Sequence, residues 1–299
     1  MAPFSVHAIN AERTIKNHLA YGLNMHEVRQ YAFFDEAYLA KLQWSPEHTL
    51  AVGNGVSENW QRLVTSLIPS LCKAVEDNAA YDHVRFFEWA TAWQSDAGNK
   101  VIEKKVISGI MFDHKQPIDF YAGKIQLQSL FDLLHLSVEW KQLSQPQEPW
   151  FMPFQTANII HDGVIMGTAG KMHPAWSAKF SAGEGFIFEL DAQLLLDYHA
   201  PIRPLRMSSK YPAIDRDISM LVPHAVTVEQ VNRIISAADQ RILKVILKDF
   251  FHKPEWKDHK SLTFRFVIQD ETKTLTKPEA DAVWEQVKAK LQTIGATIR

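Results

Sequence analysis

The C-terminal third of the chain carries strand and helix patterns in an order that few folds share. Apolar side chains recur at every second position at Leu262, Phe264 and Phe266, which is typical of a strand with one buried face. Strands are expected at 217–222, 241–252, 261–270 and 296–299, and helices at 227–239 and 276–295. The order βαββαβ predicts a ferredoxin-like domain, in which four strands bury one face against two helices and leave the other face open.

Both expected helices of this region begin with a capping box. Thr227 is followed three residues later by Gln230, and Thr276 is followed at the same interval by Glu279. In a capping box the two side chains satisfy backbone N–H groups of the first helical turn. Gly295 stands where the second helix should end, because glycine readily adopts the left-handed conformation that closes many helices.

Charge and composition divide the chain into two parts. Residues 1–202 hold 15 basic and 22 acidic side chains, a net charge of −7, whereas residues 203–299 hold 17 and 12, a net charge of +5. The stretch 199–212 carries three prolines and two serines and is expected to be a linker. We therefore expect two domains, 1–202 and 207–299. The positive charge of the second favours contact with phosphates, although an ordinary solvated surface also accounts for it.

The first domain mixes helix and strand patterns without a regular βαβ alternation. Helices are expected at 10–22, 65–78 and 122–136, and strands at 27–34, 84–93, 104–112 and 185–191. The pair Asp162-Gly163 predicts a hairpin over 156–172, because this dipeptide suits a tight two-residue turn. Ile125, Leu130, Leu133 and Leu134 are expected to share the apolar face of their helix. Together these patterns favour an α+β architecture in which helices flank an antiparallel sheet.

Several kinds of site are disfavoured by the residues present. Cys72 is the single cysteine, so neither an internal disulfide nor a cysteine-ligated metal cluster is expected. None of the 13 histidines has the paired spacing of a zinc-binding helix, and no metal site is expected. The sequence has no run of 18 apolar residues and no signal-peptide pattern at its N-terminus. We therefore expect a cytoplasmic protein without a membrane partner.

One short motif in the first domain suggests a nucleotide-binding ancestry. Arg85 is followed three residues later by Glu88 on an expected strand, which resembles the second signature motif of class II aminoacyl-tRNA synthetases. In that family the arginine grips ATP, using the bidentate geometry of its guanidinium group. Such chemistry also needs a second arginine near the last catalytic helix, and residues 170–200 contain no arginine. We therefore expect a degenerate, structural copy of a synthetase core with no catalytic residues.

Longer stretches extend this resemblance over nearly the whole chain. In the second domain they are SSKYPAIDRDISMLV (208–222), KDFFH (248–252), KSLTFRF (260–266) and KTLTKPEAD (273–281). They resemble, in order, the ferredoxin-fold anticodon-binding domain that ends the bacterial phenylalanine–tRNA ligase beta subunit. In the first domain VRFFEWATAW (84–93), DFYAGKIQLQSLFDLL (119–134) and GVIMGTAGKMHPAW (163–176) resemble the synthetase-like core of the same subunit.

The resemblance implies a role for each domain. Residues 1–202 would form a catalytically silent class II synthetase-like core that packs against the alpha subunit, with helix 10–22 at the interface. Residues 207–299 would bind the anticodon stem-loop of tRNA(Phe). The assembly would catalyse ATP-dependent aminoacylation, while this chain is not expected to be catalytic by itself. ATP and magnesium would be required by the full ligase, with no cofactor bound by this chain and no contact with DNA.

The resemblance also implies particular RNA contacts. The RNA-binding positions of the family fall on Ser219, Asp249, Phe251 and Ser261. Lys248, Lys253, Lys257 and Lys260 are expected to contact phosphates around them. Unpaired bases in RNA loops are read by stacking on aromatic rings and by hydrogen bonds to their edges, which suits these side chains. Phe250 and Phe251 are adjacent, so one of the two is expected to lie in the core, and the sequence leaves open which.

Two other functions stay open at this point. The chain would act as a small-molecule binding module if it were a free-standing synthetase-like paralogue. It would have no RNA affinity if it were a purely architectural fragment. A full beta subunit also holds an N-terminal tRNA-binding module and an editing domain, and neither is recognisable in these residues. We therefore expect the chain to be the C-terminal piece of a longer subunit.

Overall fold

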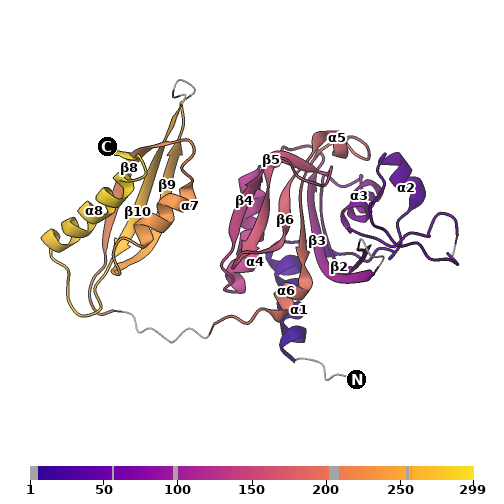
Figure 1. Cartoon of the computed structure of the whole chain (residues 1–299), viewed down its shortest axis with the longest axis horizontal. Helices are drawn as coiled ribbons and strands as arrows, with labels where there is room; N and C mark the ends of the chain where they lie inside the picture. The colour runs from indigo at the N-terminus through magenta and orange to yellow at the C-terminus, as the bar shows by residue number, and fades with distance from the viewer. Residues whose placement is uncertain (1–5, 56, 97–99, 202–208, 254–255, 257) are drawn as a thin grey trace. The chain divides into compact units, whose positions relative to one another are not determined.

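A computed structural model describes residues 6–55, 57–96, 100–201, 209–253, 256 and 258–299. The chain divides into two compact units, residues 1–202 and 203–299. Each unit has its own sheet and its own hydrophobic core (Figure 1). None of the helices in the described part of the chain is long and apolar enough to cross a membrane.

The first unit is built on a seven-stranded sheet. Its strands are β1 (His26–Glu27), β2 (His83–Ser95), β3 (Val101–Asp113), β4 (Glu139–Leu143), β5 (Phe151–His161), β6 (Val164–Met172) and β7 (Glu184–Asp191). The order across the sheet is β1-β2-β3-β7-β6-β5-β4. All neighbours are antiparallel except β1 and β2, which run parallel. The hairpin expected at Asp162-Gly163 is present between β5 and β6.

Helices cover both faces of this sheet (Figure 1). They are α1 (Val6–Asn17), the π-helical turn η1 (His18–Gly22), α2 (Glu36–Lys41), α3 (Ile68–Asp77), α4 (Phe120–Leu133), α5 (Pro174–Ser177) and α6 (Ala192–Asp197). One face of β2 places Phe87 and Trp89 against α1, α4 and α6. The opposite face places Val84 and Phe86 against α2, α3 and α5. This layered α+β arrangement confirms the fold class expected from the sequence.

Two details of the first unit differ from expectation. The strand expected at 27–34 is only two residues long in β1, followed by an isolated bridge from Phe33 to Leu63. Ile125 is 69% exposed and Leu133 is 46% exposed, so the expected places of these two residues on the apolar face of α4 are wrong. The buried face of α4 is instead set by Gly123, where a Cβ atom would lie 2.3 Å from the Phe186 ring. This close approach turns the helix so that Ile125 points to solvent.

The second unit has the ferredoxin-like order. Its elements are β8 (Ile214–Pro223), α7 (Val228–Ser236), β9 (Ile242–Phe251), β10 (His259–Ile268), α8 (Lys277–Gln292) and β11 (Thr297–Ile298). The four strands lie in the order β11-β8-β10-β9, with all neighbours antiparallel. Leu262, Phe264, Phe266 and Ile268 are buried against α7 and α8, as expected. The opposite face of the sheet carries none of the described helices (Figure 1).

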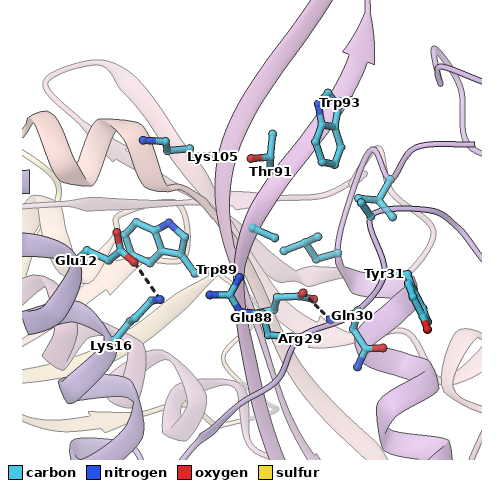
Figure 2. A pocket seen from close by; sticks show the side chains of 14 residues that line it. Glu12, Lys16, Arg29, Gln30, Tyr31, Glu88, Trp89, Thr91, Trp93 and Lys105 are labelled. Carbon is cyan, nitrogen blue, oxygen red and sulfur yellow. Dashed lines mark hydrogen bonds and ion pairs between the residues drawn. The ribbon is translucent and has the colours of Figure 1, made fainter. Parts of the chain in front are cut away.

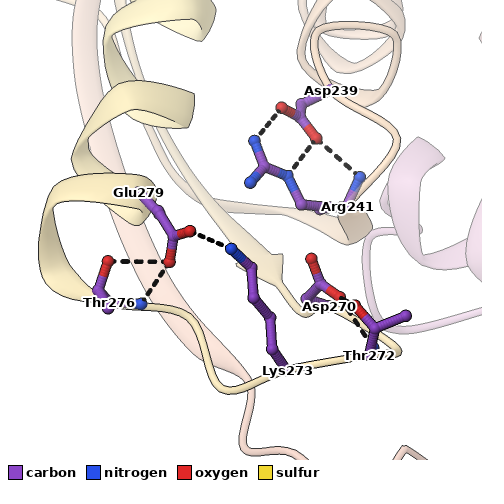
Figure 3. A network of polar contacts seen from close by, with 7 residues as sticks. All are labelled: Asp239, Arg241, Asp270, Thr272, Lys273, Thr276 and Glu279. Atoms are coloured by element: carbon purple, nitrogen blue, oxygen red, sulfur yellow. Dashed lines mark hydrogen bonds and ion pairs between the residues drawn. The ribbon is translucent and has the colours of Figure 1, made fainter.

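Local polar contacts fix the ends of the helices in this unit. The capping box at α7 is present, with Gln230 N–H donating to the Thr227 hydroxyl and Thr227 N–H donating to the Gln230 side chain. At α8 the Glu279 carboxylate accepts from the backbone N–H and the hydroxyl of Thr276, and it contacts the Lys273 ammonium (Figure 3). The Lys273 contact and the Thr276 donors together hold the pKa of Glu279 at about 2. Gly295, with φ of +80°, closes the helix as expected.

Candidate nucleic-acid interface

The polar centre of the large sheet is satisfied by its own side chains. A single carboxylate oxygen of Glu189 on β7 accepts hydrogen bonds from the Ser66 hydroxyl at 2.9 Å and the Ser108 hydroxyl at 2.6 Å. The same oxygen accepts from the Leu67 backbone N–H at 3.0 Å. Burial raises the pKa of Glu189, while these donors act in the opposite direction. A carboxylate occupied in this way holds the loop before α3 onto the sheet.

The arginine of the synthetase-like motif is also occupied. One guanidinium nitrogen of Arg85 donates to the Leu23 carbonyl oxygen at 3.0 Å and to the Gln126 side-chain oxygen at 2.8 Å. It therefore ties β2 to η1 and α4. Within the described residues no cluster of histidine, cysteine, aspartate or glutamate side chains is placed to hold a metal ion. Because Arg85 is occupied in this way, the residues at this motif do not fit an ATP grip.

The first unit has a cavity of about 410 Å³ beside β2 (Figure 2). Trp89 and Trp93 contribute to its walls together with Tyr31, and Arg29 adds a positive charge. Glu88 is only 3% exposed and lines the cavity. One of its carboxyl oxygens accepts from the Gln30 N–H at 2.8 Å, and the other has no hydrogen-bond partner within the described residues. Burial raises the pKa of Glu88.

The open face of the small sheet gathers four of the RNA contacts expected from the sequence. Side chains alternate along β10, so Ser261 and Thr263 point away from the helix-covered face. Thr263 is paired with Ser219 on one side and with Asp249 on the other. Ser261 is paired with Phe251. Ser219, Asp249, Phe251 and Ser261 therefore lie on one face, across three neighbouring strands.

These side chains differ in how far they are already bonded. The Ser219 and Thr263 hydroxyls form a hydrogen bond of 2.9 Å. The Asp249 carboxylate and the Ser261 hydroxyl have no hydrogen bond or ion pair within the described residues. A β-bulge between Asp249 and Leu247 leaves Lys248 as an extra residue in β9. Because of the bulge, Asp249 lies on the open face with Thr263, whereas Leu247 lies on the opposite face with Phe264.

The two adjacent phenylalanines are both accessible, and the expectation that one lies in the core is wrong. Phe251 is 46% exposed and Phe250 is 53% exposed. They point to opposite faces, because Phe251 pairs with Ser261 whereas Phe250 pairs with the buried Leu262. Phe250 stays exposed because it lies at the end of β9, where the strand is paired on one side only. Phe251 is therefore an aromatic ring on the face that carries Asp249 and Ser261.

The expected lysines are distributed less uniformly. Lys248 interacts electrostatically with Asp217 on the open face, and Lys253 lies 5.7 Å from the centre of the Trp256 ring. Lys260 alternates away from Ser261 and donates to the His224 carbonyl oxygen at 3.1 Å. Burial lowers the pKa of Lys260. Lys257 lies outside the described residues. The structure therefore directs Lys260 away from the open face, whereas the charge of Lys248 acts on Asp217, which lies on that face.

Other residues of the open face were not singled out from the sequence. Arg265 on β10 donates two hydrogen bonds to Asp217, at 2.7 and 2.8 Å, and lies 3.8 Å from Asp215. The Arg265 hydrogen bonds lower the pKa of Asp217. Trp256 contacts the Phe251 ring, and Arg299 lies over the Trp256 ring. Alternation along β10 would have identified Arg265, whereas no local signal in the sequence relates Arg299 to Trp256.

Comparison with known proteins identifies both units. The family model for the phenylalanyl tRNA synthetase beta chain CLM domain matches residues 6–192. The model for the ferredoxin-fold anticodon binding domain matches residues 209–299. These matches confirm the resemblance expected from the sequence.

Curated relatives carry the same description. A phenylalanine–tRNA ligase beta subunit from Halalkalibacterium halodurans is 28% identical and aligns with 96% of this chain but 38% of its own length. The beta subunit from Aromatoleum aromaticum is 29% identical, covering 94% of this chain and 37% of the relative. That of Nitrosospira multiformis is 29% identical, covering 91% and 35%. This chain thus spans well under half the length of these relatives. From its two matched domains, the chain belongs to the family of phenylalanyl tRNA synthetase beta chains.

Proposed function

We propose that the open face of the second unit binds the anticodon stem-loop of tRNA(Phe). The observation that carries this proposal is the gathering of Ser219, Asp249, Phe251 and Ser261 on one uncovered sheet face. These residues come from three strands, and the fold alone makes them neighbours. The match of residues 209–299 to an anticodon binding domain supports the same role.

The side chains on this face suit the recognition of unpaired bases. A base stacks on the exposed ring of Phe251, because base–aromatic stacking contributes affinity with every base. Asp249 accepts hydrogen bonds from base N–H groups, since its carboxylate has no partner within the described residues. The Ser261 hydroxyl, beside Phe251, donates to a base or a phosphate. Position on the face, rather than charge alone, therefore gives these residues their role.

Charge on the face directs how the RNA approaches. Asp215 and Asp217 flank Arg265, so the centre of the face carries carboxylates that disfavour phosphate. Lys253 and the aromatic side chains lie at the other end, where β9 ends and β10 begins. We infer that the sugar–phosphate backbone passes this end of the sheet and that the bases turn inward toward Asp249.

We further propose that the first unit is a catalytically silent core. The side chains of Arg85 and Glu189 form hydrogen bonds within the chain, which supports a structural role for the residues around them. The core packs against the alpha subunit of a phenylalanine–tRNA ligase in the cytoplasm, and α1 contributes to this contact. The complete ligase uses ATP and magnesium for aminoacylation, with the chemistry carried out by the partner.

The adjacent phenylalanines supply a matched experiment. Binding of a tRNA(Phe) transcript and of its isolated anticodon stem-loop is measured by fluorescence anisotropy with the full chain. Phe251→Ala is expected to weaken binding by about fivefold to 100-fold, from the usual strength of base stacking. Phe250→Ala removes an equally exposed ring from the other side of β9 and is expected to leave affinity within about twofold. Equal effects of the two variants, or no binding by the unaltered chain, would contradict the proposal.

A second candidate function rests on the cavity beside β2. Its aromatic walls, the positive charge of Arg29 and the unpartnered oxygen of Glu88 suit a small polar molecule. This would be the role of a synthetase-like paralogue that binds a small molecule through its core. Thermal unfolding of the chain in millimolar ATP or amino acids tests it. A rise in Tm that Glu88→Gln abolishes would favour this function, and an unchanged Tm with all of these compounds would exclude them as its ligands.

A further inference from the structure

Trp256 joins side chains from opposite edges of the small sheet. Its ring centre lies 5.8 Å from that of Phe251 on β9, with the two planes at 85°. The guanidinium carbon of Arg299, which follows β11, lies 5.2 Å from the centre of the same indole ring. Because β9 and β11 are the two edge strands, Trp256 reaches across the strand ends between them.

Arg299 and Trp256 are held in place by backbone contacts. The Arg299 N–H donates to the Ser219 carbonyl oxygen at 2.9 Å, which extends the pairing of β11 with β8. Alternation from Ile298, which packs on the core, places the Arg299 side chain on the open face. The Trp256 N–H donates to the Lys253 carbonyl oxygen at 2.9 Å. The Trp256 carbonyl group lies 3.4 Å from His224 Nε2 and 3.3 Å from His252 Nε2.

We propose that Phe251, Trp256 and Arg299 form a corner that binds one unstacked nucleobase and its adjoining phosphate. This inference rests on the proposed function and adds two contacts to it. The base stacks on Phe251, and the perpendicular indole closes one side of the stack. The Arg299 guanidinium, which lies over the indole ring, directs its N–H donors at the phosphate or at an acceptor on the base edge. Arg299 is paired with no carboxylate within the described residues, so its charge is available.

The helix-covered side of the same unit supplies a control. Lys288 on α8 lies 5.3 Å from the centre of the Trp284 ring, so a similar cation–aromatic contact exists away from the open face. Four variants are compared in the full chain: Trp256→Ala, Trp256→Phe, Arg299→Gln and Lys288→Gln. The probes are the anticodon stem-loop of tRNA(Phe) and a set of stem-loops that each carry one abasic site in the loop. Circular dichroism melting confirms that each variant is folded.

The corner predicts a specific pattern of affinities. Trp256→Ala should weaken binding of the intact loop by about fivefold to 100-fold, and Arg299→Gln by about fivefold. Trp256→Phe should recover most of the loss, and Lys288→Gln should bind as the unaltered chain does. For one of the abasic loops, Trp256→Ala should weaken binding by less than about twofold, because that loop lacks the base that Trp256 contacts.

Three outcomes would overturn the corner. Unchanged or tighter binding by Trp256→Ala would mean that the indole merely covers the face. A penalty that is equal for every abasic loop and for the intact loop would mean a structural effect on the unit. If Trp256→Ala does not fold, unchanged binding by Arg299→Gln decides against the proposal. Failure of the unaltered chain to bind RNA would instead refute the proposed function, so the two failures are distinguishable.

Discussion

Two carboxylates on strands show how differently the two units use polar side chains. Glu189 in the large sheet accepts three hydrogen bonds from its own chain, whereas Asp249 in the small sheet accepts none within the described residues. The arginines differ in the same way. Arg85 is bonded to two groups of the first unit, and Arg299 lies over the half-buried ring of Trp256 on the open face. Saturated polar groups stabilise a fold, and unsaturated ones on an open face are available to a partner.

The largest expected effect is on stability, when each of these two carboxylates is replaced by alanine in turn. Glu189→Ala leaves two hydroxyls and one backbone N–H without their acceptor, and should lower the free energy of unfolding of the first unit by about 3 kcal/mol. Asp249→Ala should change stability by less than about 0.5 kcal/mol, because its side chain is exposed. Denaturant unfolding followed by tryptophan fluorescence reports on the first unit, which holds seven of the nine tryptophans.

RNA binding should reverse the order of the two variants. Asp249→Ala should weaken binding of the anticodon stem-loop, and Glu189→Ala should not. Binding is measured without denaturant, at a temperature at which both variants are folded. If Asp249→Ala destabilised the chain as much as Glu189→Ala and left RNA binding intact, the comparison between saturated and unsaturated sites would fail.

The next effect concerns salt. If Lys248, Lys253 and Arg299 each contact one phosphate, the affinity for the stem-loop should fall about 20-fold between 50 and 200 mM salt. Lys253→Ala should reduce the slope of log affinity against log salt by about 0.7. Lys260→Ala is the control, because its ammonium group is already bonded to the His224 carbonyl group on the other side of the strand. If Lys260→Ala altered this slope and Lys253→Ala did not, Lys260 rather than Lys253 would be the lysine that contacts phosphate.

A smaller effect is expected from the carboxylates at the centre of the open face. Asp217→Asn removes a negative charge and releases Arg265, so affinity for RNA should rise about threefold at low salt. Asp281→Asn makes the same change in net charge at a residue that is paired with Arg216 at 3.0 Å on the helix-covered side. Titration at one salt concentration should separate the two variants. Equal gains would show that net charge, rather than position, governs binding.

The smallest effect is a difference in pH dependence between the units. Burial raises the pKa of Glu88, so its contribution to stability is full at low pH and is lost as the pH rises above about 4.5 toward that raised value. The pKa of Glu279 is lowered to about 2, so its contribution is present above about pH 4.5 and is lost as the pH falls toward 2. The contributions of these two carboxyl groups should therefore depend on pH with opposite signs.

Two substitutions test these signs separately. Glu88→Gln should flatten the loss of stability of the first unit that sets in as the pH rises above about 4.5. Glu279→Gln should flatten the acid limb of the second unit between about pH 4.5 and 2. Melting curves of each variant across this range are compared with the unaltered chain. Parallel shifts at all pH values, without flattening, would mean that neither carboxyl titrates as described.

Much of the second unit was predictable, because each of its signals is local. The Thr227 capping box, the alternation along β10 and Gly295 each specify a boundary or a face within a few residues. The open face follows from these, since two helices cover only one side of a four-stranded sheet. Ser219, Asp249 and Phe251 come together as the order of strands requires.

The remaining features depend on contacts between distant residues. The bulge at Lys248 shifts the register of β9, and no pattern in the sequence KDFF (248–251) predicts it. Trp256 meets Arg299 only because the sheet has β9 and β11 as its edges. In the first unit, the face of α4 is set by Gly123 against Phe186, a contact across 63 positions of sequence that periodicity within the helix does not reveal. Sequence patterns thus give elements and faces, while registers and close approaches need the folded chain.

The central claim is that the open face of the second unit contacts the anticodon loop, and a cross-link tests it most directly. tRNA(Phe) carrying 4-thiouridine at single positions of the anticodon loop is bound to the chain, irradiated and digested, and the adducts are located by mass spectrometry. The account predicts adducts in the peptide that contains Phe251, Trp256 and Ser261. Adducts confined to residues 1–202, or to the exposed side of α8, would contradict it.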